Sequence, residues 1–234
     1  ETPYGHDPLG TISDLKNLED NDLIALANEL PTRSKVLVIA GSYPNDLEQK
    51  INEIEPFDKL LQQNCLKKHG DENFNLNNYK VQNKSDIKLQ FENTSQVVFM
   101  IGQPTIGYSH KDAISLQLLS CYLGIGMSSK LFIELRENYG VAYDVGVHHP
   151  IREYTSPFII HASTSEEKSP LTLTLIKNLL KNIMDKPICE RELLHIKAKY
   201  RGLIAHSTQT ISQKAERKAH LLGLNLDVSE DKYN

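Results

Sequence analysis

Apolar side chains recur along the first quarter of the chain in distinct patterns. Residues 13–30 place them at roughly helical spacing and end before Pro31, which predicts a helix. The unbroken apolar run over residues 36–40, followed by Gly41, is typical of a strand buried on both faces. Residues 46–54 predict a short polar helix. One strand between two helices is too little for a domain, so we interpret residues 1–64 as the end of one.

A polar stretch rich in Asn, Gln, Lys and Asp follows over residues 62–88. Such a segment cannot bury much apolar surface, which is typical of loops and linkers. We therefore predict a linker at residues 65–85 and a second domain at residues 86–234.

Residues 86–234 carry a complete pattern of strands and helices. The predicted strands cover residues 89–91, 97–101, 141–147 and 158–160, and the predicted helices cover residues 113–123, 131–135, 175–184 and 193–222. Residues 141–147 alternate with a period of two, whereas the first helix is apolar on nearly every side and should be buried. Pairs of strands and pairs of helices in turn predict an α+β fold in two layers.

Charge and hydropathy exclude two classes of partner. The net charge of the 234 residues is −4, which lacks the basic character of nucleic-acid-binding domains. We interpret the cluster of Lys197, Lys199 and Arg201 as the solvated face of a helix. No apolar run approaches the roughly 20 residues of a membrane span. We therefore expect a soluble protein with neither a nucleic-acid partner nor a membrane span.

The cysteines are Cys65, Cys121 and Cys189. They lie far apart and form no C-x-x-C pair, which argues against a disulfide framework and against a cysteine zinc site. This usage favours the cytoplasm or another reducing compartment.

Residues 123–143 have the sequence L-G-I-G-M-S-S-K-L-F-I-E-L-R-E-N-Y-G-V-A-Y. This run resembles the L-G-G-G-M-S-S-R-L-F-x-x-L-R-E-x-x-G-L-A-Y signature of the pitrilysin/insulinase-type zinc metallopeptidases, a family that includes the mitochondrial processing peptidases. Ile125 replaces the middle glycine and Lys130 replaces the arginine. Residues 4–11, 36–41 and 190–197 resemble further segments of the family. The resemblance implies a processing-peptidase-like metallohydrolase fold, in which helices cover a mostly antiparallel sheet.

The family's zinc motif is absent from the sequence. Peptidases of this family bind zinc through H-x-x-E-H and a distant glutamate, and the glutamate of the motif activates the metal-bound water. None of the nine histidines begins such a motif, and the nearest approach has His69 with Asn73 in place of the second histidine. The resemblance thus implies no catalytic residue and no metal ligand here. It places the zinc in a missing N-terminal part or in a partner subunit.

Arg136 and Tyr143 are the candidate substrate-binding residues. In the family, an arginine and a tyrosine with this spacing reach the substrate near the zinc site, and the resemblance implies the same role here. A guanidinium offers forked donors to a peptide carbonyl or carboxylate, and a tyrosine hydroxyl can donate to an oxyanion. The alternatives are an Arg136 paired at the surface with Glu134 or Glu137, and a Tyr143 buried in the core.

Two further constellations have both a functional and a structural interpretation. His148, His149 and His161 could converge on adjacent strands near Asp144 and bind a metal, although the sequence offers no ligand spacing of known geometry. Gly124 and Gly126 superficially resemble a phosphate-binding loop, but the P-loop lysine pattern is absent. We interpret these glycines as relief for the backbone between two packed helices.

Two functions follow from the resemblance. The first is the non-catalytic, peptide-binding half of a zinc metalloendopeptidase, whose zinc-bearing domain lies in the same protein or in a partner. The second is an inactive family member that acts as a structural or binding subunit. An H-x-x-E-H motif upstream of residue 1 would favour the first function.

Overall fold

The chain divides into two units, Glu1–His69 and Gly70–Asn234. The computed structural model describes residues 7, 9–30, 36–54, 87–91, 93–108, 110–153 and 155–223. The division falls within the predicted linker at 65–85, which lies outside the described residues together with Cys65 and His69. The predicted domain limits therefore stay predictions, and each unit is described by itself.

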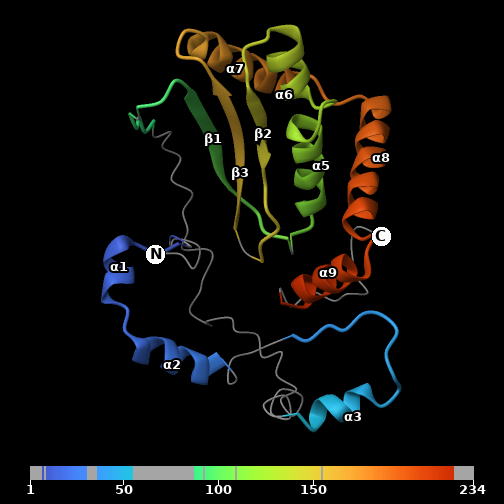
Figure 1. Ribbon diagram of the computed structural model, residues 1–234. Helices are drawn as coiled ribbons and strands as arrows, with labels where there is room; N and C mark the ends of the chain where they lie inside the picture. The colour runs from blue at the N-terminus through green and yellow to red at the C-terminus, as the bar shows by residue number, and fades with distance from the viewer. Residues whose placement is uncertain are drawn as a thin grey trace. The chain divides into compact units, whose positions relative to one another are not determined.

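The described residues of the first unit form three short helices, α1 (Ile12–Asn17), α2 (Asp20–Glu29) and α3 (Leu47–Asn52) (Figure 1). The prediction of one helix over 13–30 is wrong, because the chain turns extended at Leu18 and Glu19. The backbone N–H of Glu19 donates to Asp22 Oδ2 at 3.0 Å, which begins a new helix with a capping box. Local polar side chains therefore interrupt the apolar periodicity.

Residues 36–40 do not form the predicted strand. They are extended, but no residue in the described part of the chain pairs with them. A strand requires a hydrogen-bonded neighbour, so an apolar run by itself does not make one. Leu37 and Ile39 are exposed, and together with Leu47 and Ile51 they line an open hollow of about 330 Å³.

The second unit is built on an antiparallel sheet of β1 (Val97–Thr105), β2 (Asp144–His148) and β3 (Ser156–Thr164), in the order β1-β3-β2 (Figure 1). Ile101 pairs with Ile160, and Gly146 pairs with His161. The predicted strand at 89–91 is absent, and these residues are exposed and unpaired in the sheet.

The helices of this unit in the described part of the chain are α5 (Ala113–Gly124), α6 (Lys130–Phe132), α7 (Ser169–Asp185), α8 (Glu190–Ser207) and α9 (Ile211–Gly223), and a π-helix, η3 (Ile133–Asn138), continues α6. The single helix predicted over 193–222 is two helices. Thr208 leaves the helical conformation, and Thr210 and Gln213 exchange side-chain-to-backbone hydrogen bonds of 3.0 and 3.1 Å that begin α9.

The core lies between one face of the sheet and the helices. Ile160 and Ala162 of β3 pack there with buried side chains of α5, α6, η3 and α7, which are Leu123, Leu131, Leu135, Leu175 and Ile176. Val98 and Met100 face the other side of β1 and are exposed. One covered face and one open face fit the period-two pattern of an antiparallel sheet. The predicted α+β class, with helices over an antiparallel sheet, is confirmed.

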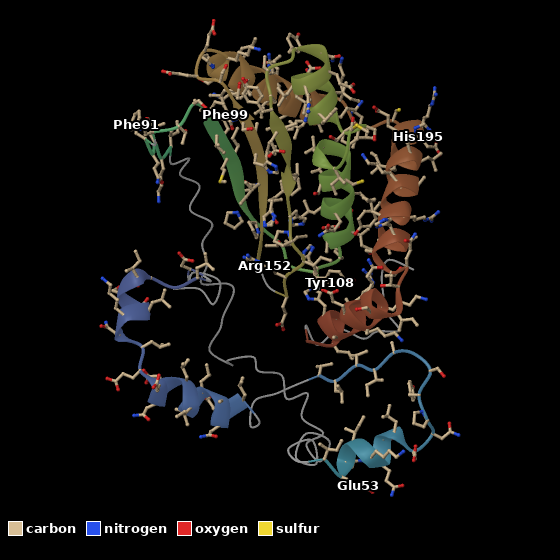
Figure 2. All side chains as sticks on the ribbon, viewed as in Figure 1. Glu53, Phe91, Phe99, Tyr108, Arg152 and His195 are labelled. Carbon is tan, nitrogen blue, oxygen red and sulfur yellow. The ribbon has the colours of Figure 1, made fainter. Side chains whose placement is uncertain are left out.

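A second apolar cluster ties the end of the sheet to the last helices. Tyr108 and Leu221 are buried there. Tyr108 N also donates to Arg152 O at 2.8 Å, and both residues lie at the same end of the sheet (Figure 2). None of the helices in the described part of the chain has both the length and the apolar character that crossing a bilayer demands.

Candidate functional site

Arg136 lies on the π-helix η3, whose packing fixes which side chains reach the surface. Leu131 and Leu135 are fully buried in the core, and Arg136, next along the chain, is exposed. The guanidinium carbon of Arg136 lies 5.3 Å from the centroid of the Phe132 ring, which is within cation–π range. Tyr139 N donates to Glu134 O at 3.2 Å, a bond of the π type, and such turns are frequent at functional sites.

The structure brings Arg136 and Tyr143 together. Arg136 Nη1 donates to the backbone carbonyl of Tyr143 at 3.1 Å. Tyr143 N donates in turn to Ser163 O of β3 at 2.8 Å, so the Tyr143 backbone is held from two sides. The contact uses the Tyr143 carbonyl, and the Tyr143 side chain is 57% exposed.

The two structural alternatives for this pair do not hold. Glu134 Oε2 accepts a hydrogen bond from Asn138 Nδ2 at 3.0 Å, and within the described ranges no carboxylate lies at ion-pair distance from Arg136. Tyr143 is not a core residue. A guanidinium has five N–H donors, and the bond to Tyr143 O engages one of them.

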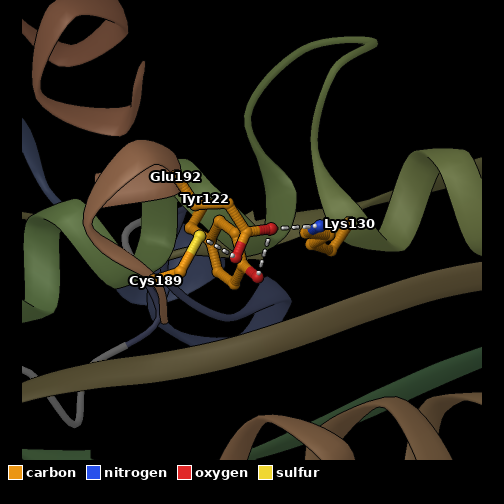
Figure 3. A network of polar contacts seen from close by, with 4 residues as sticks. All are labelled: Tyr122, Lys130, Cys189 and Glu192. Carbon is orange, nitrogen blue, oxygen red and sulfur yellow. Dashed lines mark hydrogen bonds and ion pairs between the residues drawn. The ribbon is translucent and has the colours of Figure 1, made fainter. Parts of the chain in front are cut away.

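Lys130, the residue that departs from the family's arginine, forms an ion pair with α8. Lys130 Nζ lies 2.7 Å from Glu192 Oε1 and 5.3 Å from the centroid of the Tyr122 ring (Figure 3). Tyr122 Oη and Cys189 Sγ each donate to a Glu192 oxygen at 3.5 Å. This network joins α5, the start of α6 and the start of α8.

The network has clear effects on acidity. The hydrogen bond from Lys130 lowers the pKa of Glu192, and the same bond raises the pKa of Lys130. Burial raises the pKa of the Tyr122 hydroxyl. Burial also raises the pKa of the Cys121 thiol, which the charge of Lys199 opposes. These shifts favour a charged Lys130–Glu192 pair beside a neutral phenol.

The loop between α5 and α6 is fixed by α8 and by the sheet. Lys199 Nζ donates to Ile125 O and, at 2.9 Å, to Ser128 Oγ. A Cβ on Gly124 would meet Val147 N at 2.3 Å and Val147 Cγ2 at 2.6 Å, so the end of α5 lies directly against β2. The interpretation of Gly124 as relief between two helices is therefore wrong, since the close neighbour is a strand.

Lys199 and Glu192 are residues whose role the sequence interpretation missed. Lys199 is half-buried and bonded, so its assignment to a solvated helix face is wrong. Both lie on a helix whose sequence resembles a family segment, but neither that resemblance nor the helical spacing indicates which loop they contact.

His148, His149 and His161 do not form a metal site with Asp144. His161 Nε2 lies 3.5 Å from Asp144 Oδ2, whereas His149 Nδ1 lies 3.0 Å from the carbonyl of Pro157. In the described ranges no three His, Cys, Asp or Glu residues are placed to hold a metal ion. The described residues thus provide no donor set that fits zinc, and the sequence-based prediction of zinc elsewhere in the full protein stays a prediction.

Several known proteins are similar to this chain in sequence and in fold. A family model described as the peptidase M16 inactive domain matches residues 34–200. An uncharacterized zinc protease of Rickettsia bellii is 27% identical over 218 residues, which cover 92% of this chain and 50% of that protein. The non-peptidase homolog YmxG of Helicobacter pylori is 22% identical over an aligned length of 239, which covers 100% of this chain and 53% of that protein.

A solved structure supports the same assignment. The crystal structure of a peptidase M16 inactive domain from Pseudomonas fluorescens is similar with a TM-score of 0.52 and 26% identity, over 58% of this chain and 32% of that one. The chain spans about half the length of the two curated relatives. The resemblance to zinc metallopeptidases is confirmed, because the family model covers more than half of the chain. The chain belongs to the M16 peptidase family and carries that family's inactive domain.

Proposed function

We propose that this chain is the non-catalytic, substrate-binding half of a zinc-dependent metalloendopeptidase, in which Arg136 and Tyr143 contact the peptide. The zinc-bearing half, in the same protein or in a partner subunit, would supply the bond-breaking chemistry. The observation that carries the proposal is the exposed pair itself, joined by the bond of 3.1 Å from Arg136 to the Tyr143 carbonyl.

The pair offers a peptide two complementary kinds of donor. The guanidinium of Arg136 is always charged, and the bond to Tyr143 O uses one of its five N–H donors, so the fork retains donors for a carbonyl or carboxylate. The phenol of Tyr143 belongs to an exposed side chain and can donate to the oxyanion that forms when water attacks the scissile carbonyl. Neither group needs to leave a partner carboxylate in the described part of the chain.

Substitution in the complete protein, with its zinc-bearing half present, tests the proposal. Arg136→Ala and Tyr143→Phe should each lower kcat/KM. The expected loss of transition-state stabilisation is about 2–4 kcal/mol, the usual scale for one preorganised donor. Tyr139→Phe is a matched control, because Tyr139 is 52% exposed on the same connection and lies four residues from Tyr143. Wild-type kcat/KM in both test variants would refute the substrate-binding role.

The second candidate function is that of an inactive family member that acts as a structural or binding subunit. The similarity to a protein named as a non-peptidase homolog favours it. Metal analysis of the complete protein, isolated together with any subunit that it binds, separates the two functions. Bound zinc with chelator-sensitive peptide hydrolysis supports the first, and peptide binding without hydrolysis supports the second.

A further inference from the structure

The connection between Arg136 and Tyr143 is held by backbone bonds on its inner side. Val141 N and Ala142 N both donate to the carbonyl of Leu135, at 2.8 and 3.2 Å. Gly140 has a φ of +59°, in the left-handed region that favours glycine. These bonds close the turn against η3 and leave the carbonyls of Gly140 and Val141 directed elsewhere.

Side chains from the end of β3 and from the segment that leads into α7 take up those two carbonyls. Lys168 Nζ donates to Gly140 O at 3.0 Å, and Thr164 Oγ1 donates to Val141 O at 2.5 Å. Thr172 Oγ1, one turn into α7, lies 3.2 Å from Thr164 Oγ1 and 2.9 Å from Lys168 O. Because Thr164 donates its own proton to Val141 O, it can only accept from Thr172, whose single hydroxyl proton is shared between Thr164 Oγ1 and the closer Lys168 O. The two donors to the turn, Thr164 and Lys168, together with the Thr172 hydroxyl that contacts both residues, form a relay from α7 through β3 to the turn.

Burial separates this relay from ordinary surface hydrogen bonds. The side chains of Thr164 and Thr172 are fully buried, and a hydroxyl in such a place loses the water that would otherwise solvate it. Valine has nearly the same shape and carries no such penalty. The Thr164 hydroxyl, which ends on the carbonyl two residues before Tyr143, therefore has a use that packing alone does not supply.

We propose that Thr164, Thr172 and Lys168 are positioning residues for the Arg136–Tyr143 pair. They hold the carbonyls of Gly140 and Val141 in place. The backbone conformation at Ala142, and with it the position of the Tyr143 carbonyl that Arg136 binds, is thereby set. The inference rests on the proposed substrate-binding function. It adds residues that do not touch the peptide but set the distance between the two that do.

The experiment compares Thr164→Val, which keeps the shape and removes the hydroxyl, with Thr164→Ser, which keeps the hydroxyl. Amide hydrogen exchange of residues 139–143 and binding of a fluorescein-labelled peptide, chosen from a random library by affinity for the wild-type complete protein, are the two measurements. Thr164→Val should speed exchange at Val141, Ala142 and Tyr143 by about tenfold or more, because it leaves a buried carbonyl without its donor. It should weaken peptide binding by at least about fivefold, whereas Thr164→Ser should stay near wild type in both measurements.

Thr174→Val is the matched control. Thr174 lies on the same helix and donates to Pro170 O at 2.8 Å in the same i to i−4 geometry as Thr172, but it is exposed and far from the turn in sequence. Its loss should change neither measurement. A general response of the unit to losing any threonine hydroxyl of α7 would appear in this variant as well.

Each outcome decides the inference. Faster exchange with unchanged peptide binding in Thr164→Val would make the relay purely structural and overturn it, provided that Arg136→Ala still weakens binding. Unchanged binding in Arg136→Ala and Tyr143→Phe would instead overturn the proposed function. If Thr164→Val fails to fold, Lys168→Met decides, since Lys168 is exposed. A several-fold loss of binding in that variant supports the inference, and wild-type binding overturns it.

Discussion

Gly124 is the position at which a single methyl group tests the packing of helix on sheet. A Cβ there would lie 2.3 Å from Val147 N and 2.7 Å from Gly146 C, and real Cβ atoms essentially never come closer than 3.0 Å to such atoms. Both neighbours are backbone atoms of β2, which cannot swing away as the end of a flexible side chain can, and Val147 Cγ2 would lie 2.6 Å away as well. Gly124→Ala must therefore push the end of α5 off the sheet.

The expected cost follows from that geometry. Forcing an extra carbon into a well-packed interior costs about 1–3 kcal/mol, and the upper part of the range applies where only backbone can move. Alanine also restricts the unfolded chain, which returns about 0.4–1 kcal/mol where the native conformation is compatible. We therefore expect Gly124→Ala to make the separation of α5 from β2 easier, by a net free energy of about 2 kcal/mol.

Cys121 provides a local assay for this opening. Its side chain is fully buried three residues before Gly124 on the same helix, so a thiol reagent labels it only when α5 opens. In a background with Cys65→Ser and Cys189→Ser, Gly124→Ala should speed labelling by about 30-fold, since each 1.4 kcal/mol is a factor of ten. Gly202→Ala is the control of opposite sign. No atom outside the helix backbone lies within 4 Å of its Cβ, and alanine in a helix interior stabilises by about 0.5–1 kcal/mol. A wild-type labelling rate in Gly124→Ala would refute the close contact.

Two further predictions concern charge and catalysis. The pKa of Glu192 is lowered by Lys130, so its contribution to stability is present above the ordinary value of 4.5 and is lost as the pH falls through the lowered pKa. The pKa of Lys130 is raised by the same bond, so its contribution is present below 10.5 and is lost as the pH rises through the raised pKa. Because the two side chains are 40% and 38% exposed, solvent screens the pair, and Glu192→Gln should lower the urea unfolding free energy by less than about 1 kcal/mol at neutral pH and by nothing at strongly acidic pH. The isolated 234-residue chain should hydrolyse no peptide in a zinc-dependent way; a rate abolished by chelator and restored by zinc would contradict this expectation.

The elements that the sequence predicted well are those with strong local signals. Helix 113–123 appears as α5, since its apolar run is long enough for a helix, and the helix at 175–184 appears within α7, because its apolar periodicity matches a buried face. The failures depend on distant or polar partners. Residues 36–40 have the composition of a strand but no paired neighbour among the described residues, and Glu19 and Thr210 begin helices where hydrophobic spacing alone predicts continuity.

The candidate site was only partly predictable for the same reason. The family signature indicated Arg136 and Tyr143, but not that the guanidinium binds the Tyr143 carbonyl. Arg136 lies on the π-helix η3, and the turn that precedes Tyr143 accepts a hydrogen bond from Thr164, 21 residues beyond Tyr143. Likewise, Lys130 and Glu192 are 62 residues apart in the sequence. A linear motif carries residue types at fixed spacing, and such long-range partners lie outside it.

The two departures from the signature fall where the structure permits them. Ile125 has φ −97° and ψ 116°, an extended conformation that any residue adopts, so the middle glycine of the motif is not required. Gly126, which is retained, has φ +72°, where a side chain is strained. Lys130 needs only one contact, to Glu192 Oε1, and a lysine point charge meets it as well as the fork of an arginine would. The substitutions therefore leave untouched the glycines with a geometric role and the Arg136–Tyr143 pair. The conformational demands of the α5–α6 loop, and not overall similarity, separate the tolerant positions of this motif from the strict ones.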